Sequence, residues 1–120
     1  MLTLPDTERD ALTLLGHFFL RQQQPERALT VFAALELLEP GRIEHARCVA
    51  VAALNAGRPQ RAMLALDRIA LAGRLDPTFH LARSLTLLAL ERNDEAATAM
   101  RAWMDAKEPQ GDSTPGERAA

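Results

Sequence analysis

Tyrosine is absent from this chain of 120 residues, aromatic residues make up only 4% of it, and Cys48 is its single cysteine. One cysteine excludes an internal disulfide bond and any metal site built from several cysteines. No apolar run approaches the roughly 20 residues that a membrane-spanning helix needs. Acidic and basic residues nearly balance, with a net charge of −2 and no basic stripe. We therefore expect neither nucleic acid as a partner nor direct membrane insertion.

The sequence also lacks the residue patterns of common catalytic sites. The three histidines, His17, His45 and His80, have no i, i+4 spacing and occupy different phases of the repeat described below. There is no glycine-rich phosphate loop. The two serines, Ser84 and Ser113, have no candidate base near them in sequence. We therefore expect no enzyme activity, no cofactor and no metal site.

Alanine, leucine and arginine dominate instead, and they are strong helix formers. Prolines and glycines divide the chain into pieces of helix length, with Pro25, Pro59 and Pro77 each placed to open a helix. The predicted helices cover residues 7–22, 25–38, 43–56, 59–72, 77–91 and 94–107. The sequence therefore predicts an all-α fold of antiparallel helical hairpins.

An internal repeat supports this prediction. Three sets of residues have members spaced 34 residues apart, which is the period of the tetratricopeptide repeat. The sets are Ala28, Ala62 and Ala96; Leu20, Leu54 and Leu88; and Phe32, Leu66 and Met100. A small residue late in each first helix (Gly16, Ala50 or Ser84) lets the second helix approach closely.

The predicted fold is accordingly three tandem tetratricopeptide-like hairpins in a short α-solenoid. One domain, residues 1–108, holds repeats at about 9–42, 43–76 and 77–108. Residues 109–120 contain almost nothing apolar and are predicted to form a disordered tail.

The first helix of each tetratricopeptide hairpin lines a concave groove. An apolar strip in such a groove is typical of a surface that binds an amphipathic, helical segment of a partner. The alternative is that the leucines on these first helices are core residues, covered by a neighbouring helix or by a dimer partner. The candidate partner-binding residues are His17, Leu20, Arg47, Val51, Leu54, Leu81, Leu85 and Leu88.

Over about residues 9–108 the chain resembles a family of dedicated chaperones of bacterial type III secretion systems, the YscY (SctY) type. The resemblance rests on these phrases: Leu14-Leu15-Gly16-His17-Phe18-Phe19-Leu20, Glu26-Arg27-Ala28, Leu37-Leu38-Glu39-Pro40, Ala46-Arg47-Cys48, Val51-Ala52-Ala53-Leu54-Asn55 and Arg92-Asn93-Asp94-Glu95-Ala96. The chain departs from the pattern at Leu71-Ala72-Gly73-Arg74-Leu75, which lengthens a turn.

This resemblance implies a bacterial chaperone that stabilises a small secreted export component, YscX (SctX), and helps to present it to the export-gate protein SctV. The first ten residues lack the layout of a secretory signal, so we expect a cytoplasmic protein. Two alternatives are open. One is a chaperone for the needle subunit (YscG type) or for the translocators (LcrH/SycD type). The other is a self-associating tetratricopeptide adaptor or scaffold.

Overall fold

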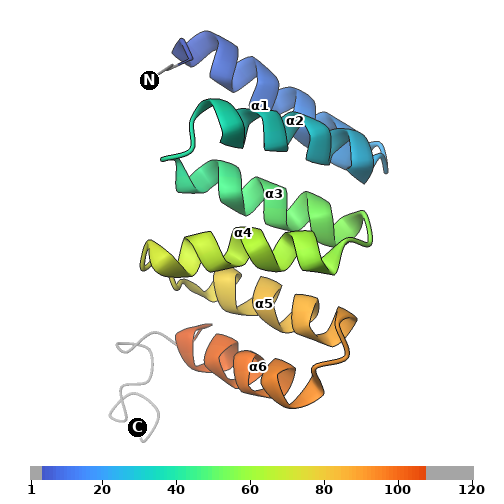
Figure 1. The fold of residues 1–120 in the computed structure, drawn as a ribbon, viewed down its shortest axis with the longest axis vertical. Helices are drawn as coiled ribbons and strands as arrows, with labels where there is room; N and C mark the ends of the chain where they lie inside the picture. Colours follow the sequence, from blue (N-terminus) through green and yellow to red (C-terminus); the bar gives the residue numbers. More distant parts are fainter. Residues whose placement is uncertain (1–3, 108–120) are drawn as a thin grey trace, which may run out of the picture. The chain divides into compact units, whose positions relative to one another are not determined.

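The computed structural model describes residues 4–107, which form six α-helices and no strand (Figure 1). The helices are α1 (Asp6–Arg21), α2 (Pro25–Leu38), α3 (Ile43–Asn55), α4 (Pro59–Leu71), α5 (Pro77–Ala89) and α6 (Asn93–Lys107). The all-α prediction is confirmed, and the largest boundary error is at the end of α5, predicted at residue 91 and observed at Ala89. No helix among these residues is long and apolar enough to cross a membrane. The predicted tail, 109–120, lies outside the described residues.

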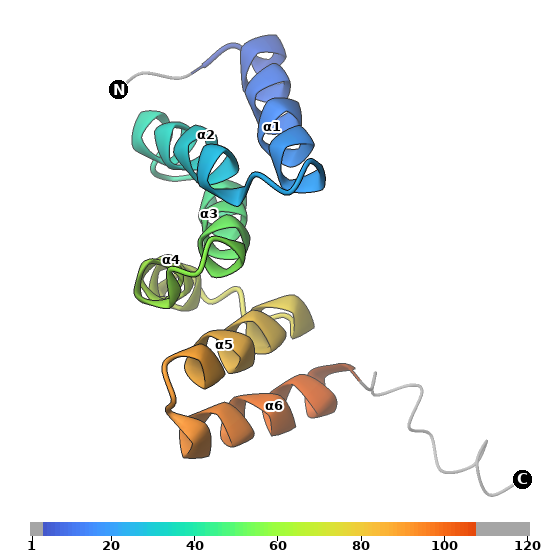
Figure 2. The same ribbon diagram turned by 90° about the vertical axis from the view of Figure 1, so that its right-hand side faces the viewer.

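The chain divides into two compact units at Arg74. Unit 1 contains α1 to α4, in which each helix packs on the next one along the chain. Unit 2 begins at Leu75 and contains α5 packed on α6. Figure 2 shows the short turns that join α1 to α2 and α5 to α6. The single domain over residues 1–108, with its three repeats, stays a prediction.

Three of the helices begin at proline, as the sequence predicts. Pro25, Pro59 and Pro77 are the first residues of α2, α4 and α5. Proline suits this position because the first turn of a helix leaves its N–H groups without intrahelical acceptors. At α5 the preceding Asp76 adds a cap, since its Oδ1 accepts a hydrogen bond of 3.0 Å from the backbone N–H of Phe79.

The 34-residue period recurs in the backbone of the three hairpin turns. Each turn has one residue in the left-handed region: Gln23 (φ 60°), Gly57 (φ 74°) and Glu91 (φ 60°). The next residue in each turn donates its N–H to a carbonyl five positions back, at 2.8–2.9 Å. These bonds join Gln24 to Phe19, Arg58 to Ala53, and Arg92 to Leu87. This pattern is a helix C-cap of the Schellman type, repeated at equivalent positions.

Close approach of α1 to α2 depends on Gly16. A Cβ atom added there would lie 2.5 Å from Cε1 and Cζ of Phe32, a ring that is completely buried. The predicted role of Gly16 as the small residue of its hairpin is thus explained by a specific contact. The equivalent residues Ala50 and Ser84 are also buried.

Within unit 1, ion pairs join α2 to α4. Glu26 at the start of α2 accepts hydrogen bonds from Arg58 Nε, 3.0 Å and 3.2 Å from its two carboxylate oxygens. Near the other end of α2, the buried Glu36 pairs with Arg61 and Arg68 of α4. These contacts place the second helices of the first two hairpins side by side.

Candidate partner-binding surface

The predicted binding residues on α3 lie outside the buried face of that helix. The buried residues of α3 are His45, Ala46, Val49, Ala50, Ala52 and Ala53. Val51 is 41% exposed, whereas Arg47 and Leu54 are half-buried. A helix packed on two sides leaves only a narrow strip for other contacts, and this strip contains the three predicted residues.

On α1, the structure places His17 and Leu20 in two different environments. His17 is exposed, but its ring packs edge-on against Phe32 of α2, with ring centroids 5.2 Å apart. Leu20 is half-buried and lines a small surface hollow with Gln23, Pro25 and Asn55. Because Asn55 follows Leu54, the hollow brings Leu20 close to the end of α3.

Unit 2 carries the remaining three predicted residues on α5. Leu81, Leu85 and Leu88 follow the i, i+4, i+7 spacing of one helix face. Leu85 is 43% exposed and Leu88 is 48% exposed, and Leu81 is half-buried. The buried side of α5 is formed by other residues, among them Phe79 and Leu87.

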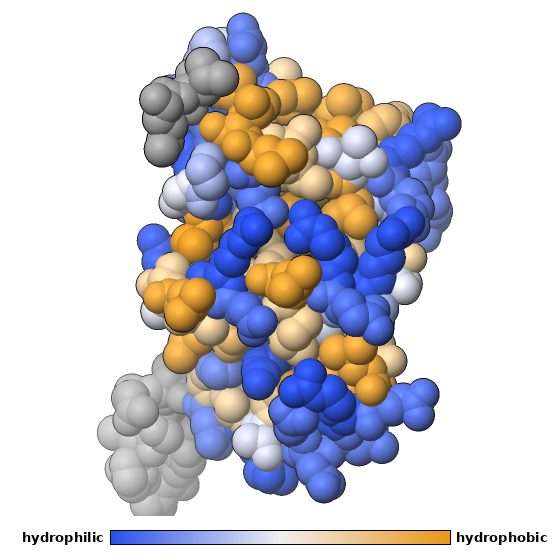
Figure 3. Space-filling model, viewed as in Figure 1, coloured by the Kyte–Doolittle hydropathy of each residue, from blue (hydrophilic) through white to orange (hydrophobic). Residues whose placement is uncertain are grey.

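None of the eight predicted residues is fully buried. Transfer of a Val or Leu side chain out of water contributes about 1.5–3 kcal/mol when burial is complete, and about half as much from a half-exposed start. Apolar side chains also reach the surface elsewhere, including the end of unit 1 where α1 and α2 lie (Figure 3). Partner binding at the eight residues stays a prediction.

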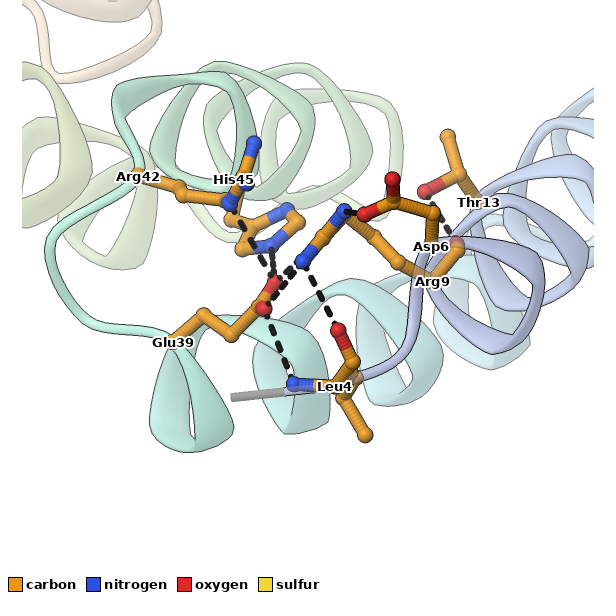
Figure 4. Close-up of polar contacts among 7 residues, drawn as sticks. All are labelled: Leu4, Asp6, Arg9, Thr13, Glu39, Arg42 and His45. Carbon is orange, nitrogen blue, oxygen red and sulfur yellow. Dashed lines mark hydrogen bonds and ion pairs between the residues drawn. The ribbon is translucent and has the colours of Figure 1, made fainter. Parts of the chain in front are cut away.

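The most highly connected polar group in the structure is one that sequence reasoning missed. Glu39, at the end of α2, is buried, and its carboxylate accepts two hydrogen bonds from Arg9 of α1 (Figure 4). Arg9 Nε lies 2.8 Å from Oε1 and Arg9 Nη2 lies 2.7 Å from Oε2. Such a two-pronged arginine–carboxylate pair fixes orientation as well as distance.

Further groups surround this pair, among them Arg42, whose Nε lies 3.6 Å from Glu39 Oε1. His45 Nε2 of α3 lies 2.9 Å from Glu39 Oε1, and the backbone N–H of Leu4 donates to Oε2 at 3.1 Å. Arg9 also donates to Asp6 Oδ1 at 2.6 Å and to the Leu4 carbonyl at 2.9 Å. We refer to Leu4, Asp6, Arg9, Glu39 and His45 as the α1–α3 polar cluster. It ties three helices and the segment before α1 together.

The hydrogen bonds of the α1–α3 polar cluster shift the pKa values of its central pair. Arg9, followed by His45, holds the pKa of Glu39 far below its usual range, and desolvation opposes this only in part. The bond to Glu39, with a smaller contribution from Asp6, raises the pKa of Arg9. Both groups are therefore charged at neutral pH. An unpaired buried charge would be costly, so each ion here depends on its partner.

Cys48 of α3 is half-buried. Burial, with a smaller effect from Glu44, raises the pKa of this thiol. The thiol is therefore protonated at neutral pH and is a poor nucleophile.

Among residues 4–107 no group of three or more His, Cys, Asp or Glu side chains is arranged to hold a metal ion. Comparison of the chain with protein-family models, with curated proteins and with solved structures finds no match.

Proposed function

We propose that this protein is a chaperone of the type III secretion class, which acts by binding a small partner polypeptide and has no catalytic step. The fold that we propose for it is a tetratricopeptide-like array of three hairpins. The repeated left-handed turns at Gln23, Gly57 and Glu91 support this array, because all three have the same geometry at a constant spacing of 34 residues. The ion pairs between α2 and α4 also suit stacked hairpins.

The observation that carries the binding function is the exposure of apolar side chains on α3 within unit 1 and on α5 within unit 2. Val51 of α3 is 41% exposed, and Leu85 and Leu88 of α5 are 43% and 48% exposed. Exposed apolar side chains at helical spacing are the usual recognition surface for an amphipathic helix. Arg47, one turn before Val51 on α3, and His17 on α1 supply polar contacts that orient such a helix.

The proposed partner is a small export component of the YscX (SctX) type, delivered to the export-gate protein SctV in the bacterial cytoplasm. This partner follows from the resemblance of residues 9–108 to YscY-type chaperones. Binding to an apolar strip keeps an aggregation-prone segment covered until export. The mechanism requires affinity and release, and no bond is made or broken.

Co-expression of the full chain with a YscX-type protein tests this proposal. We expect the two chains to co-purify in equal amounts, and Leu85→Glu to weaken the complex at least tenfold because it places a charge in the apolar contact. Leu64→Glu is the matched control, since Leu64 is 60% exposed on α4 and lies outside the predicted groove.

Titration calorimetry on the purified chains measures both effects. A complex that is equally weakened by Leu64→Glu and Leu85→Glu contradicts the groove. Absence of any complex with a YscX-type protein overturns the assignment of the partner. Formation of a complex with a needle-subunit or translocator segment instead identifies one of the alternative cargoes.

A further inference from the structure

Helix α1 has a second apolar face, which lies away from its contact with α2. Leu14 is 66% exposed, Phe18 is 52% exposed and Leu15 is 40% exposed, and Ala11 is exposed beside them. These four positions follow the i, i+3, i+4, i+7 spacing of a single stripe. We call Ala11, Leu14, Leu15 and Phe18 the α1 stripe. The buried Gly16 lies on the opposite face of the helix, so the α1 stripe does not contribute to the packing of its own hairpin.

The repeat shows how the equivalent face is used in the next hairpin. The residues of α3 that lie 34 positions after the α1 stripe are His45, Cys48, Val49 and Ala52. Val49 and Ala52 are completely buried, and α2 is the helix that packs on α3 in addition to α4. Within residues 4–107, no helix covers the corresponding face of α1. A helix is therefore the kind of occupant that this face fits.

The positions of the stripe residues are symmetric about the point midway between Leu14 and Leu15. Ala11 precedes Leu14 by three positions, and Phe18 follows Leu15 by three. In an antiparallel pair of α1 helices centred at this point, Leu14 of one copy faces Leu15 of the other. The small Ala11 faces the large Phe18, so the side chains on the two helices complement each other in size.

The charges at the two ends of α1 continue this symmetry. Glu8 precedes Leu14 by six positions, and Arg21 follows Leu15 by six. Both side chains are exposed, and neither has an ion-pair partner among residues 4–107. In the antiparallel pair, Glu8 of each copy lies at the same level as Arg21 of the other, so that opposite charges attract at both ends and long side chains can form two ion pairs. A parallel pair would place Glu8 against Glu8, so the charges favour the antiparallel arrangement.

We propose that α1 is a self-association surface, on which a second copy of this chain pairs antiparallel through the α1 stripe with Glu8–Arg21 ion pairs at both ends. With 16 residues, α1 is about 24 Å long, and one helix pair buries less than the ~1,200 Å² of a stable complex. The dimer therefore exchanges with monomer, with a dissociation constant on the order of micromolar. None of the stripe residues belongs to the eight residues of the proposed groove, so either proposal can fail without the other.

Sedimentation equilibrium of the full chain, from low to high micromolar concentration, tests the pairing. The wild type is expected to show a reversible monomer–dimer equilibrium. Glu8→Arg and Arg21→Glu, each alone, place like charges in contact and raise the dissociation constant about tenfold. The double variant Glu8→Arg/Arg21→Glu restores the attraction in the reverse sense and returns the constant to near the wild-type value. Leu14→Glu abolishes the dimer.

Leu64→Glu on α4 serves as the control, because it adds the same charge at a similarly exposed leucine outside the stripe and leaves the dimer intact. Far-UV circular dichroism confirms that all variants keep the wild-type helix content. Three results overturn the proposal: a wild type that is monomeric throughout, a dimer that survives Leu14→Glu, or a double reversal that is as weak as either single one. The proposal is also overturned if the protein is a monomer and Leu14→Glu abolishes its binding to a YscX-type protein, since the α1 stripe then binds a helix of another protein.

Discussion

Units 1 and 2 use the same hairpin turn but differ in how their charged residues are placed. In unit 1, the carboxylates of Glu36 on α2 and of Glu39, directly after α2, are buried and pair with arginines on other helices. In unit 2, the carboxylate of Glu95 is half-exposed and pairs with Arg92, only three residues away. Glu36 and Glu39 of unit 1 therefore pair with arginines of other helices, in addition to the local pairs Arg9–Asp6 and Arg42–Glu39. The Arg92–Glu95 pair of unit 2 is local to the start of α6.

Apolar contacts and buried ion pairs have different effects on helix packing. Small apolar residues such as Ala62 and Ala96 set how closely two helices approach, and both units have them. Apolar contacts are not directional, however, and they allow helices to slide. A buried, hydrogen-bonded ion pair such as Arg9–Glu39 permits one geometry only. We infer that the α1–α3 polar cluster fixes the register of the first two hairpins, a constraint that α5 and α6 do not need within their own hairpin.

The largest loss of stability is expected from removing a buried carboxylate of unit 1. Glu39→Ala leaves Arg9 charged and buried without its partner, and we expect the thermal midpoint to fall by on the order of 10 °C. Glu95→Ala in unit 2 removes an exposed local pair and should have little effect. Thermal unfolding followed by circular dichroism measures both. Equal midpoints for the two variants would contradict the distinction drawn between the units.

A double variant sharpens this result. Replacing Arg9 and Glu39 together by leucine removes both ions, so that neither is left buried alone. We expect this variant to be more stable than Glu39→Ala, although His45 and Asp6 lose a partner. If the double variant is the less stable of the two, the ion pair itself contributes net stability.

We expect acid to destabilise the protein by protonating Glu39. The pKa of Glu39 is lowered in the folded protein from an ordinary value of 4.5. A carboxylate with a depressed folded pKa contributes stability that is fully present above its unfolded pKa and is lost as the pH falls through the folded value. We therefore expect the free energy of unfolding to decrease as the pH falls below about 4.5. Urea titrations at a series of pH values measure this slope.

Glu39→Gln provides the control for the acid effect, because an amide keeps the shape of the side chain but does not titrate. The variant should start from a lower stability and show a shallower decrease below pH 4.5 than the wild type. An unchanged slope would assign the acid sensitivity to other carboxylates.

An intermediate effect is expected at Gly16, where α1 lies close to Phe32 of α2. Gly16→Ala gains helix propensity but forces the new Cβ against the buried ring of Phe32. Overpacking costs about 1–3 kcal/mol and the propensity gain is about 1 kcal/mol, so we expect a net loss of roughly 1 kcal/mol. Gly41→Ala, where a Cβ meets nothing within 4 Å, is the control and should change stability little. The two free energies come from urea unfolding, and equal values would show that Phe32 moves aside freely.

The helices and their period were predictable from the sequence because their signals are local. Proline at residues 25, 59 and 77 and alanine every 34 residues report directly on helix starts and on close contacts between neighbouring helices. Gly16 could be singled out in the same way. A leucine at a groove position, such as Leu85, could also be placed on the outer side of its helix by spacing alone.

The α1–α3 polar cluster could not be predicted in this way. Arg9 and Glu39 are 30 residues apart and belong to types that are almost never fully buried, so sequence reasoning assigns them to the surface. The α1 stripe was missed for the opposite reason. Leu14 and Phe18 contribute to the family resemblance and predict no surface of their own, and only the structure shows that nothing among residues 4–107 covers them. Burial depends on which helix lies next to a residue, and a single sequence does not encode that locally.

The smallest effects are expected at the hairpin turns, where the two units are most alike. Glu91 in unit 2 and Gln23 in unit 1 hold a left-handed backbone that the equivalent Gly57 adopts without a steric penalty. Glu91→Gly and Gln23→Gly should each stabilise the protein by about 0.5–1 kcal/mol, since relief of the left-handed strain outweighs the added freedom of the unfolded chain. Gly57→Ala introduces the same strain and should destabilise by about 1 kcal/mol. Opposite signs for the glycine and alanine variants, measured by urea unfolding, would show that one turn geometry with one energetic cost recurs in both units.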